Sequence, residues 1–282
     1  MENPYQKLSR QQASDAVTGL GWRLVLGELR TEVRTGSLPL AADVAARAAS
    51  VAGVDGHLRL DVRGDRVILA LQTAAAGWVT ERDVELARNL STMVEQSRLE
   101  TVSGTGRDSR SGDRVILALQ TATEGWVTER DVELARNLST MVEQSRWETV
   151  SGAGRDSRSG DRSVQVLEIG IDALDAAAIR PFWQAVLGYI DEPGRGGPWD
   201  GLIDPLGQGP AVWFQRMDAP RPQRNRIHFD VSVPHDEAEP RIQAALAAGG
   251  TLLRDTEAPA FWVLADAEGN EACITTWQGR DG

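Results

Sequence analysis

The spacing of hydrophobic and polar residues changes period several times along the first hundred residues. Segments with apolar residues at helical spacing alternate with segments in which every second residue is apolar. The expected helices and strand pairs occupy, in chain order, residues 9–20, 22–36, 40–53 and 57–73. Residues 80–97 then predict an amphipathic helix, with Thr80 as its N-cap and Asp83 three residues later. This part of the chain therefore predicts an α+β arrangement in which the hairpin 57–73 buries one face.

The strand and helix expected in residues 64–98 recur as residues 112–146, with differences only at Ala75/Thr123 and Ala76/Glu124. The period is 48 residues, and the Gly-, Ser- and Arg-rich linker behind each copy is repeated as well. Stable repeat arrays generally need three or more units, which diverge outside their core positions. The pattern therefore indicates a tandem duplication. The second copy lacks a preceding hairpin strand, so we expect it to dock on a sheet edge or to exchange with the first copy, within or between chains.

The order strand–helix–strand–strand–strand occurs twice between residues 163 and 282. The first of these two units ends with the apolar strand expected at 211–217. The second begins with the strand expected at 226–233 and ends with the strand expected at 271–277. Two such units predict paired βαβββ modules whose sheets curl around a shared cleft. The expected layout is a domain at 1–98, a linker at 99–112, the copied strand–helix unit at 113–146, a linker at 147–162 and a domain at 163–282.

Composition narrows the classes of partner. The net charge of −11 and the pI near 4.9 argue against nucleic acid or an anionic membrane as the main partner. No apolar run approaches the roughly 20 residues that span a bilayer, and the first residues lack the pattern of a signal peptide, so we expect a cytoplasmic protein. A single cysteine, Cys273, excludes an internal disulfide framework and a multi-cysteine zinc site.

Four stretches, GLGWRL, LRTEVRTG, VAARAASVAG and GWVTERDVELARNL, resemble the pterin-4a-carbinolamine dehydratases, small α+β proteins that remove water from a 4a-hydroxytetrahydropterin. The resemblance implies an antiparallel sheet with helices on one face and a pterin ligand. The family uses two adjacent histidines before its third strand, and a third histidine followed by an acid after its fourth. These positions hold Gly56, His57, Ala74 and Ala75 here. In the second copy, the third histidine and the acid are replaced by Ala122 and Thr123.

Dehydration needs one group that protonates the leaving hydroxyl and another that takes a proton from a ring nitrogen, and imidazoles suit both tasks. His57 is the sole remaining candidate acid/base, and a one-residue shift would place it at the first histidine position instead. The competing interpretation of His57 is a partly exposed histidine at a strand edge. We therefore expect a catalytically impaired module that is retained for binding or assembly.

The segment 163–282 resembles the glyoxalase-like members of the vicinal oxygen chelate (VOC) superfamily through PFWQAVLGY, WDGLIDPLGQGPAVWFQRM, NRIHFDVSV and WVLADAEGNEACI. Metal-dependent members hold ligands at four points, which correspond here to Glu168, Phe214 or Gln215, His228 and Cys273. Half of the oxygen and imidazole ligands that suit a hard divalent metal are missing. We therefore assign no metal and no cofactor, keep a divalent metal as the less favoured alternative, and retain His228 and Glu168 as candidate catalytic groups.

An organic pocket is the favoured interpretation of this segment, because aromatic walls with a few polar groups describe a small-molecule site. The candidate substrate-binding residues are Trp213, Gln215, Arg226, Asp230, Trp262, Glu271 and Cys273. The alternative for the polar members is a solvated strand face or a structural hydrogen bond. Trp183 is expected in the core, and Gly269 and Asn270 are expected to form a turn.

Three functional hypotheses follow. The first is a glyoxalase-like domain that binds, and transforms, a small molecule beside an impaired dehydratase-like module. The second is a sequestering or resistance protein that uses the same pocket without catalysis, and the third is an active carbinolamine dehydratase (a lyase) with an accessory domain. The expected partners are a small-molecule ligand and further copies of the chain in a homo-oligomer, with a domain-swapped form as one arrangement.

Overall fold

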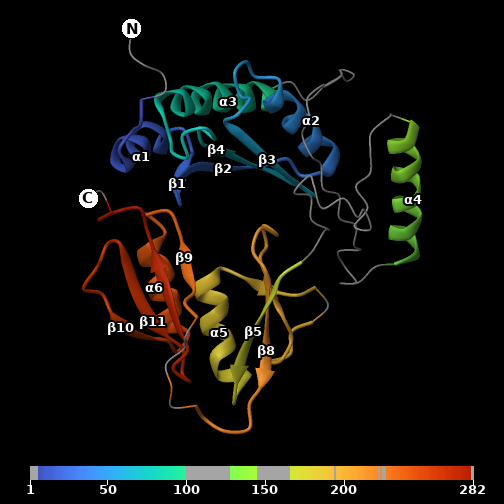
Figure 1. The fold of residues 1–282 in the computed structure, drawn as a ribbon. Coiled ribbons are helices and arrows are strands. Elements are labelled where there is room, and N and C mark those ends of the chain that lie inside the picture. The colour runs from blue at the N-terminus through green and yellow to red at the C-terminus, as the bar shows by residue number, and fades with distance from the viewer. Residues whose placement is uncertain are drawn as a thin grey trace, which may run out of the picture. The chain divides into compact units, whose positions relative to one another are not determined.

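The computed structural model describes residues 6–99, 128–144, 166–193, 195–221, 223 and 227–280, and of residues 97–99 and 142–144 only the backbone. The first described part contains α1 (Arg10–Thr18), β1 (Arg23–Val25), β2 (Glu28–Arg34), α2 (Leu38–Ala49), β3 (Leu58–Arg63), β4 (Arg66–Leu71) and α3 (Glu81–Leu99). The four strands form one antiparallel sheet in the order β1-β2-β4-β3. Figure 1 shows the three helices on the same side of this sheet, so the predicted α+β fold is confirmed.

Alternation along β4 builds the core of this part. Val67, Leu69 and Leu71 are fully buried and belong to one hydrophobic cluster with residues from all three helices. From α3, Val84, Leu86, Ala87 and Leu90 are at most 1% exposed. Burying side chains of this size stabilises a fold by roughly 1.5–3 kcal/mol each before conformational entropy is subtracted. The first copy of the repeat (residues 64–98, copy 1 below) therefore supplies one strand and one helix that the core requires.

The other face of the sheet carries ion pairs between arginines and acids. Glu28 accepts two hydrogen bonds of 2.8 Å from Arg59 on β3 and lies 2.8 Å from Arg30 on its own strand. Burial raises the pKa of Glu28, but the hydrogen bond from Arg59 and the charge of Arg30 outweigh it, so the net pKa is lowered from 4.5. Long arginine side chains cover apolar surface with their alkyl stems, which is consistent with the burial of Ile68 and Ala70 on this face.

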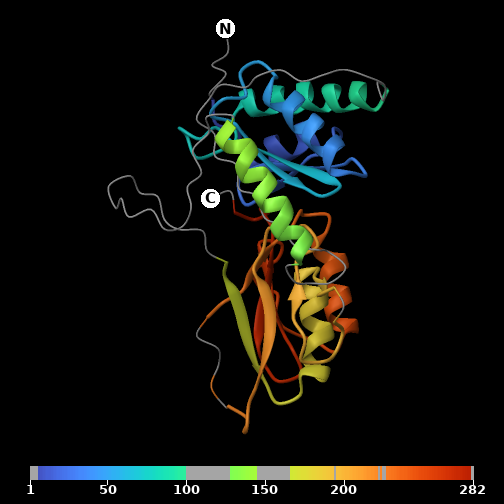
Figure 2. The ribbon, with the colours of Figure 1, turned by 90° about the vertical axis from the view of Figure 1, so that its right-hand side faces the viewer.

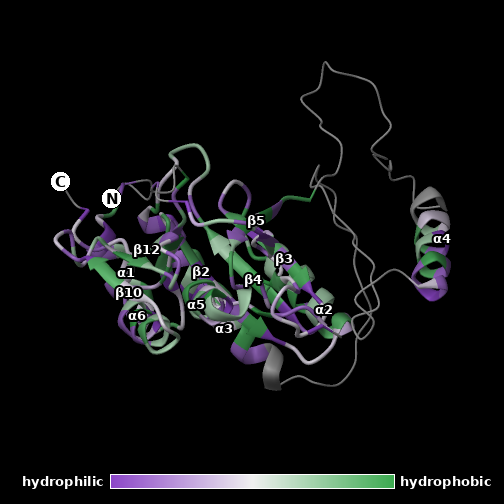
Figure 3. Cartoon of the chain, turned by 90° about the horizontal axis from the view of Figure 1, so that it is seen from below, coloured by the Kyte–Doolittle hydropathy of each residue, from purple (hydrophilic) through white to green (hydrophobic). Residues whose placement is uncertain are grey.

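The helix of the second copy (residues 112–146, copy 2 below) forms at the equivalent residues, as α4 (Glu129–Gln144). Thr128 donates from its backbone N and its Oγ1 to Asp131, at 2.8 and 2.7 Å, and its Oγ1 accepts from the Asp131 N–H at 3.4 Å, which caps the helix. Figure 3 shows hydrophobic and hydrophilic residues along α4. Val132, Leu134 and Met141 are exposed to 40%, 40% and 47%. The strand expected in copy 2 lies outside the described residues.

The carboxy-terminal part repeats one strand order twice. Its elements are β5 (Glu168–Ala173), α5 (Ala176–Leu187), β6 (Ile190–Asp191), β7 (Leu202–Ile203), β8 (Ala211–Arg216), β9 (Asp230–Ser232), α6 (Ala238–Ala247), β10 (Thr251–Arg254), β11 (Phe261–Ala265) and β12 (Glu271–Thr275). The sheets have the equivalent orders β5-β8-β7-β6 and β9-β12-β11-β10, and in each the first and last strands of the module pair in parallel. Figure 2 shows the first of these pairs, β5 and β8, side by side. The predicted βαβββ modules are confirmed.

Trp183 lies in the core, as expected, and is fully buried. Its indole N–H donates to Asp266 at 3.0 Å. Asp266 also accepts from the backbone N and the side-chain amide of Asn270, at 2.9 and 2.8 Å, and Gly269 has a positive φ of 87°. Gly269 and Asn270 therefore form a turn, as predicted. In the described part of the chain, no helix has the length and apolar character needed to cross a bilayer.

Candidate functional site

The hairpin β3–β4 brings His57 and Thr73 together just beyond the ends of its strands. Leu58 pairs with Leu71 at the last position of the ladder. Two further hydrogen bonds continue it, from Gln72 N to His57 O at 3.0 Å and from Ala74 N to Gly56 O at 2.8 Å. The chain then reaches Thr80 and the first turn of α3, which carries Asp83. The site is therefore built from the end of a hairpin and the start of the helix that follows it.

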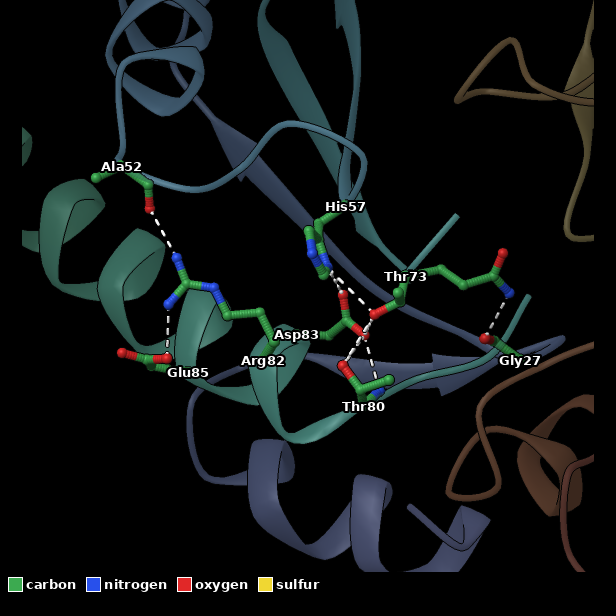
Figure 4. A network of polar contacts seen from close by, with 9 residues as sticks. Gly27, Ala52, His57, Thr73, Thr80, Arg82, Asp83 and Glu85 are labelled. Atoms are coloured by element: carbon green, nitrogen blue, oxygen red, sulfur yellow. Dashed lines mark hydrogen bonds and ion pairs between the residues drawn. The ribbon is translucent and has the colours of Figure 1, made fainter. Parts of the chain in front are cut away.

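These side chains form one network, which Figure 4 shows from close by. His57 Nδ1 lies 2.7 Å from Asp83 Oδ1. Asp83 Oδ2 accepts from Thr73 Oγ1 at 2.7 Å, from Thr80 N at 2.7 Å and from Thr80 Oγ1 at 3.1 Å. Thr73 Oγ1 also lies 3.2 Å from His57 Nδ1 and 2.9 Å from Thr80 Oγ1. Asp83 is thus the common acceptor of the network.

Burial makes these contacts strong. The Asp83 side chain is 0% exposed and the His57 side chain 7%. A buried carboxylate is costly unless it is hydrogen-bonded, and bonds to a charged acceptor are about twice as strong as neutral ones. Because a carboxylate only accepts, the proton of the neutral imidazole lies on Nδ1, and Nε2 is the basic ring nitrogen.

His57 directly precedes the edge strand β3 and is partly exposed as a residue, as the competing interpretation expects, although its imidazole is not. Its side chain is buried because the hairpin ladder extends past Leu58 and fixes the backbone of His57, while Asp83 binds the ring from the helix. The neighbouring position cannot hold a second histidine without strain, since Gly56 has a φ of +73°.

Copy 2 repeats the carboxylate of this site but not the histidine. Thr128 and Asp131 reproduce the cap that Thr80 and Asp83 form. The repeated sequence starts at Gly64, after His57. The chain therefore has two capped helices of the same sequence, of which, in the described residues, only α3 follows a hairpin with a histidine at its end.

In the first βαβββ module, the strand register places Glu168, Trp213 and Gln215 on one face of the β5–β8 pair. Glu168 pairs with Ala211, Gly170 with Trp213 and Asp172 with Gln215, and Trp213 is 41% exposed. A Cβ on Gly170 would lie 3.0 Å from the Trp213 ring, so the glycine lets the indole lie against the strand. Phe214 is 4% exposed and faces the opposite side. Of the two residues considered for the second ligand point, Gln215 is the one that shares a face with Glu168.

In the second module, Asp230, Glu271 and Cys273 share one face of the sheet. Cys273 pairs with Asp230 on β9 and with Val263 on β11, whereas Trp262 pairs with Ile274 and so lies on the other face. Burial, the charge of Asp230 and a hydrogen bond to it raise the pKa of Cys273 to about 11.

The remaining two candidates of this module lie outside its strands. His228 is exposed and precedes β9, and no hydrogen bond or ion pair joins it to another described residue. Arg226 lies outside the described residues.

The donors do not fit a divalent metal. No group of three or more His, Cys, Asp and Glu side chains in the described ranges could hold one. Cys273 offers a soft sulfur donor at the point where a hard divalent metal prefers a carboxylate oxygen. Gln215 is a neutral ligand where a charged or imidazole donor would serve better.

The sequence analysis missed Thr73 as a site residue and treated Thr80 and Asp83 as a helix cap alone. Their cap geometry was a usable signal, because a Thr-x-x-Asp cap directly after a hairpin brings a carboxylate to the hairpin end. The sequence pattern did not show that His57 lies opposite this cap. That placement depends on the register between β3 and β4.

Comparison with known proteins assigns both parts of the chain. The family model for pterin 4 alpha carbinolamine dehydratase matches residues 6–93, and the one for the glyoxalase-like domain matches residues 168–275. A protein of Mycolicibacterium smegmatis, named provisionally as a pterin-4-alpha-carbinolamine dehydratase, is 36% identical over 86 residues, which are 30% of this chain and 92% of that protein. A Streptomyces coelicolor protein of the same name is 39% identical over 90 residues, covering 31% of this chain and 89% of that protein.

Solved structures match the two parts separately. A glyoxalase/bleomycin resistance protein/dioxygenase family enzyme from Burkholderia phytofirmans is 22% identical, with a TM-score of 0.32, and the match covers 39% of this chain and 95% of that one. A transcriptional coactivator/pterin dehydratase from Brucella melitensis is 25% identical, with a TM-score of 0.29, and covers 32% and 99%. The chain belongs to the pterin-4a-carbinolamine dehydratase family through residues 6–93, and joins to that family's domain a glyoxalase-like domain in residues 168–275.

Proposed function

We propose that residues 6–93 catalyse the slow dehydration of a 4a-hydroxytetrahydropterin, with His57 as the acid/base group. The observation that carries the proposal is the 2.7 Å contact between His57 Nδ1 and the buried carboxylate of Asp83. This arrangement orients the ring and sets its tautomer, as a general base requires.

One imidazole can perform both proton transfers in sequence. Nε2 takes the proton from the pterin ring nitrogen, and the resulting imidazolium is stabilised by the Asp83 carboxylate. The electron pair of the former N–H bond then forms a C4a=N double bond while the C4a–O bond breaks and its electron pair leaves with the oxygen. The imidazolium returns the proton to that oxygen, so that water is released. The negative charge of Asp83 stabilises His57 most strongly when the imidazole is protonated. It therefore stabilises the transition state more than the ground state.

Turnover should be slow because the other two histidine positions hold Gly56 and Ala74. Removing a general acid or base typically costs about 10²–10⁴-fold in rate. We therefore expect a rate above the uncatalysed dehydration but well below that of relatives with all three histidines.

The test is the decay of a 4a-hydroxytetrahydropterin, followed by absorbance with the full chain. We expect acceleration by the native protein, none by His57→Ala, and an unchanged rate for His235→Ala, which is the matched histidine control outside residues 6–93. No acceleration by the native chain, or equal acceleration by His57→Ala, would refute the proposal.

We further propose that the glyoxalase-like domain binds a small organic molecule. The supporting observation is the exposed Trp213, seated against Gly170 on the same strand face as Glu168 and Gln215. A flat aromatic surface beside polar groups suits a ring-containing metabolite.

A thermal-shift screen of the full chain, with elemental analysis of the same sample, tests this second function. Stabilisation by a compound that is lost in Trp213→Ala supports it, and near-stoichiometric metal would overturn the metal-free assignment. Product formation that depends on His228 would indicate an enzyme, and binding without turnover would indicate a sequestering protein. We expect a homo-oligomer, which sedimentation equilibrium would measure.

A further inference from the structure

The chain contains one lysine, Lys7, and its backbone lies next to the candidate site. Lys7 forms an isolated antiparallel pair with Thr80, and Trp78 forms another with Thr73, to which it is bonded from Thr73 N to Trp78 O at 3.2 Å. Both threonines belong to the network around His57 that Figure 4 shows. Lys7 and Trp78 are therefore the backbone neighbours of two site residues.

The side chains of Lys7 and Trp78 contact each other at the surface. The Lys7 ammonium lies 5.0 Å from the centre of the Trp78 ring. Trp78 is 41% exposed, and Lys7 is exposed as well. Because Trp78 lies two residues before Thr80, it is diagonal to Lys7 across the pair, and long side chains reach that far. The face of an indole attracts a cation, so the ring holds the ammonium at a defined place.

The positive charge of Lys7 is not neutralised within the described part of the chain. Lys7 forms no ion pair with any described residue, although the chain contains 41 aspartates and glutamates and has a net charge of −11. Glu81, which is exposed and follows the backbone partner of Lys7, does not pair with it either. The ammonium is therefore available to a negatively charged ligand.

We propose that Lys7 and Trp78 form an anion subsite at the margin of the His57 site (the Lys7 subsite below). The group that binds there is a carboxylate or a phosphate on the side chain of the pterin, so that the site prefers an anionic pterin to a neutral one. The inference rests on the proposed dehydratase function, because it requires that a pterin lies against His57.

The chemistry of the pair suits an anion. The ammonium has three N–H donors, and its contact with the ring reduces the side-chain freedom that binding would otherwise remove. The edge of an aromatic ring carries a partial positive charge, unlike its face, so Trp78 can approach the same anion edge-on. Elsewhere the acidic surface of the chain repels anions. A neutral side chain of the pterin would gain none of these attractions.

The Lys7 subsite is close enough to His57 to serve the same ligand. Thr73 Oγ1 lies 3.2 Å from His57 Nδ1. Residues that face each other in an antiparallel pair have Cβ atoms about 4.5–5.5 Å apart, and Trp78 faces Thr73 in this way. The path from the imidazole to the indole is thus on the order of 10 Å, which a bicyclic pterin with a short side chain spans.

The test is the binding of stable, oxidised pterins to the full chain, measured by isothermal titration calorimetry at low ionic strength. The ligands are 6-hydroxymethylpterin, which is neutral, its phosphate ester and pterin-6-carboxylate. An exposed pair of opposite charges strengthens binding by up to roughly fivefold, and we expect a preference of this size for an anionic pterin. The anion with the larger gain identifies the group. High salt should reduce the preference.

Variants assign the preference to the Lys7 subsite. Lys7→Gln should remove it, and Lys7→Arg should keep most of it because the positive charge remains. Trp78→Leu should weaken it, because the ammonium is then no longer held in place. The matched control is Arg88→Gln, which changes the net charge equally at an exposed position two turns further along α3. We expect Arg88→Gln to keep the native preference.

The outcomes separate this inference from the proposed function. Equal affinities of the native chain for the neutral and both anionic pterins would overturn the Lys7 subsite and leave the proposed dehydratase intact. A preference that survives in Lys7→Gln, or that Arg88→Gln reduces equally, would also overturn the subsite, because another group or the net charge would then be responsible. If the native chain bound none of the three pterins, the subsite and the proposed function would both be refuted.

Discussion

The substitution Asp83→Asn separates an electrostatic role of this carboxylate from a structural one. Thr80 N donates to Asp83 Oδ2 at 2.7 Å, and a backbone N–H cannot reverse its polarity. The asparagine must therefore direct its carbonyl oxygen toward Thr80 and its NH₂ group toward His57. That NH₂ group donates to Nδ1, so the imidazole proton moves to Nε2, the nitrogen that must be free of it to act as the base.

The expected magnitudes follow from the contacts. Three bonds to Oδ2 survive as weaker neutral bonds, and the fourth, to His57, reverses its direction. We expect the free energy of unfolding to fall by about 2–4 kcal/mol. We expect the rate of pterin dehydration to fall by about 10²–10⁴-fold, because the wrong tautomer cannot accept the proton. The assays are denaturant unfolding of the full chain and the absorbance decay of the 4a-hydroxytetrahydropterin.

The repeat supplies an internal control. Asp131→Asn changes the same residue in the same local sequence, but Asp131 caps α4. It should cost about 1 kcal/mol of local helix stability and leave the dehydration rate unchanged. If Asp83→Asn lowers stability but turns over substrate at the native rate, Asp83 has only a structural role and the assigned tautomer is wrong.

Three further outcomes are expected. At pH 8, iodoacetamide should alkylate Cys273 at least roughly 100-fold more slowly in the folded chain than in urea, because its pKa is raised from 9.0 to about 11; equal rates would contradict the burial of this thiol. Glu28→Gln should lower the unfolding free energy by only about 1 kcal/mol at neutral pH, because Arg59 is 61% exposed and solvent screens its attraction to Glu28. Since the pKa of Glu28 is lowered, the native chain should lose the stabilisation by this ion pair as the pH falls below 4.5. The unfolding free energies of the native chain and of Glu28→Gln should therefore become equal in acid, and a difference that persists would count against the ion pair. Gly170→Ala should displace the Trp213 ring, since the added Cβ would lie 3.0 Å from it, and shift the tryptophan emission with little change in Tm; an unchanged emission would show that the ring does not rest on this strand.

Local patterns predicted the elements well because their causes are local. The hairpin of β3 and β4, the Thr80 cap of α3 and the turn at Asn270 each follow from spacing and side-chain chemistry within a few residues. The site depends on contacts between residues distant in sequence, such as His57 and Asp83. A correct hairpin register was required to see that the imidazole of this histidine is buried, and a strand period alone does not supply it.

The same limit applied to the glyoxalase-like domain. Alternation indicated that Trp262 and Cys273 lie on strands, but whether they share a face depends on the length of the turn between β11 and β12. The observed register pairs Trp262 with Ile274 and so separates it from Cys273. Glu168 and Gln215 share a face because β5 and β8 pair in parallel, a contact between the ends of the module.

The backbone at Gly56 bears on whether the lost histidines could return during evolution. Position 56 has a φ of +73°, and a histidine in this conformation would be strained by about 1–2 kcal/mol. A histidine could therefore return to position 56 only if the loop changed its backbone conformation as well. Ala74 is exposed and its backbone N–H is bonded to Gly56 O, so a single substitution could introduce an imidazole at this position. The main chain thus opposes a histidine at position 56, whereas a histidine at position 74 needs one substitution and no change of the backbone.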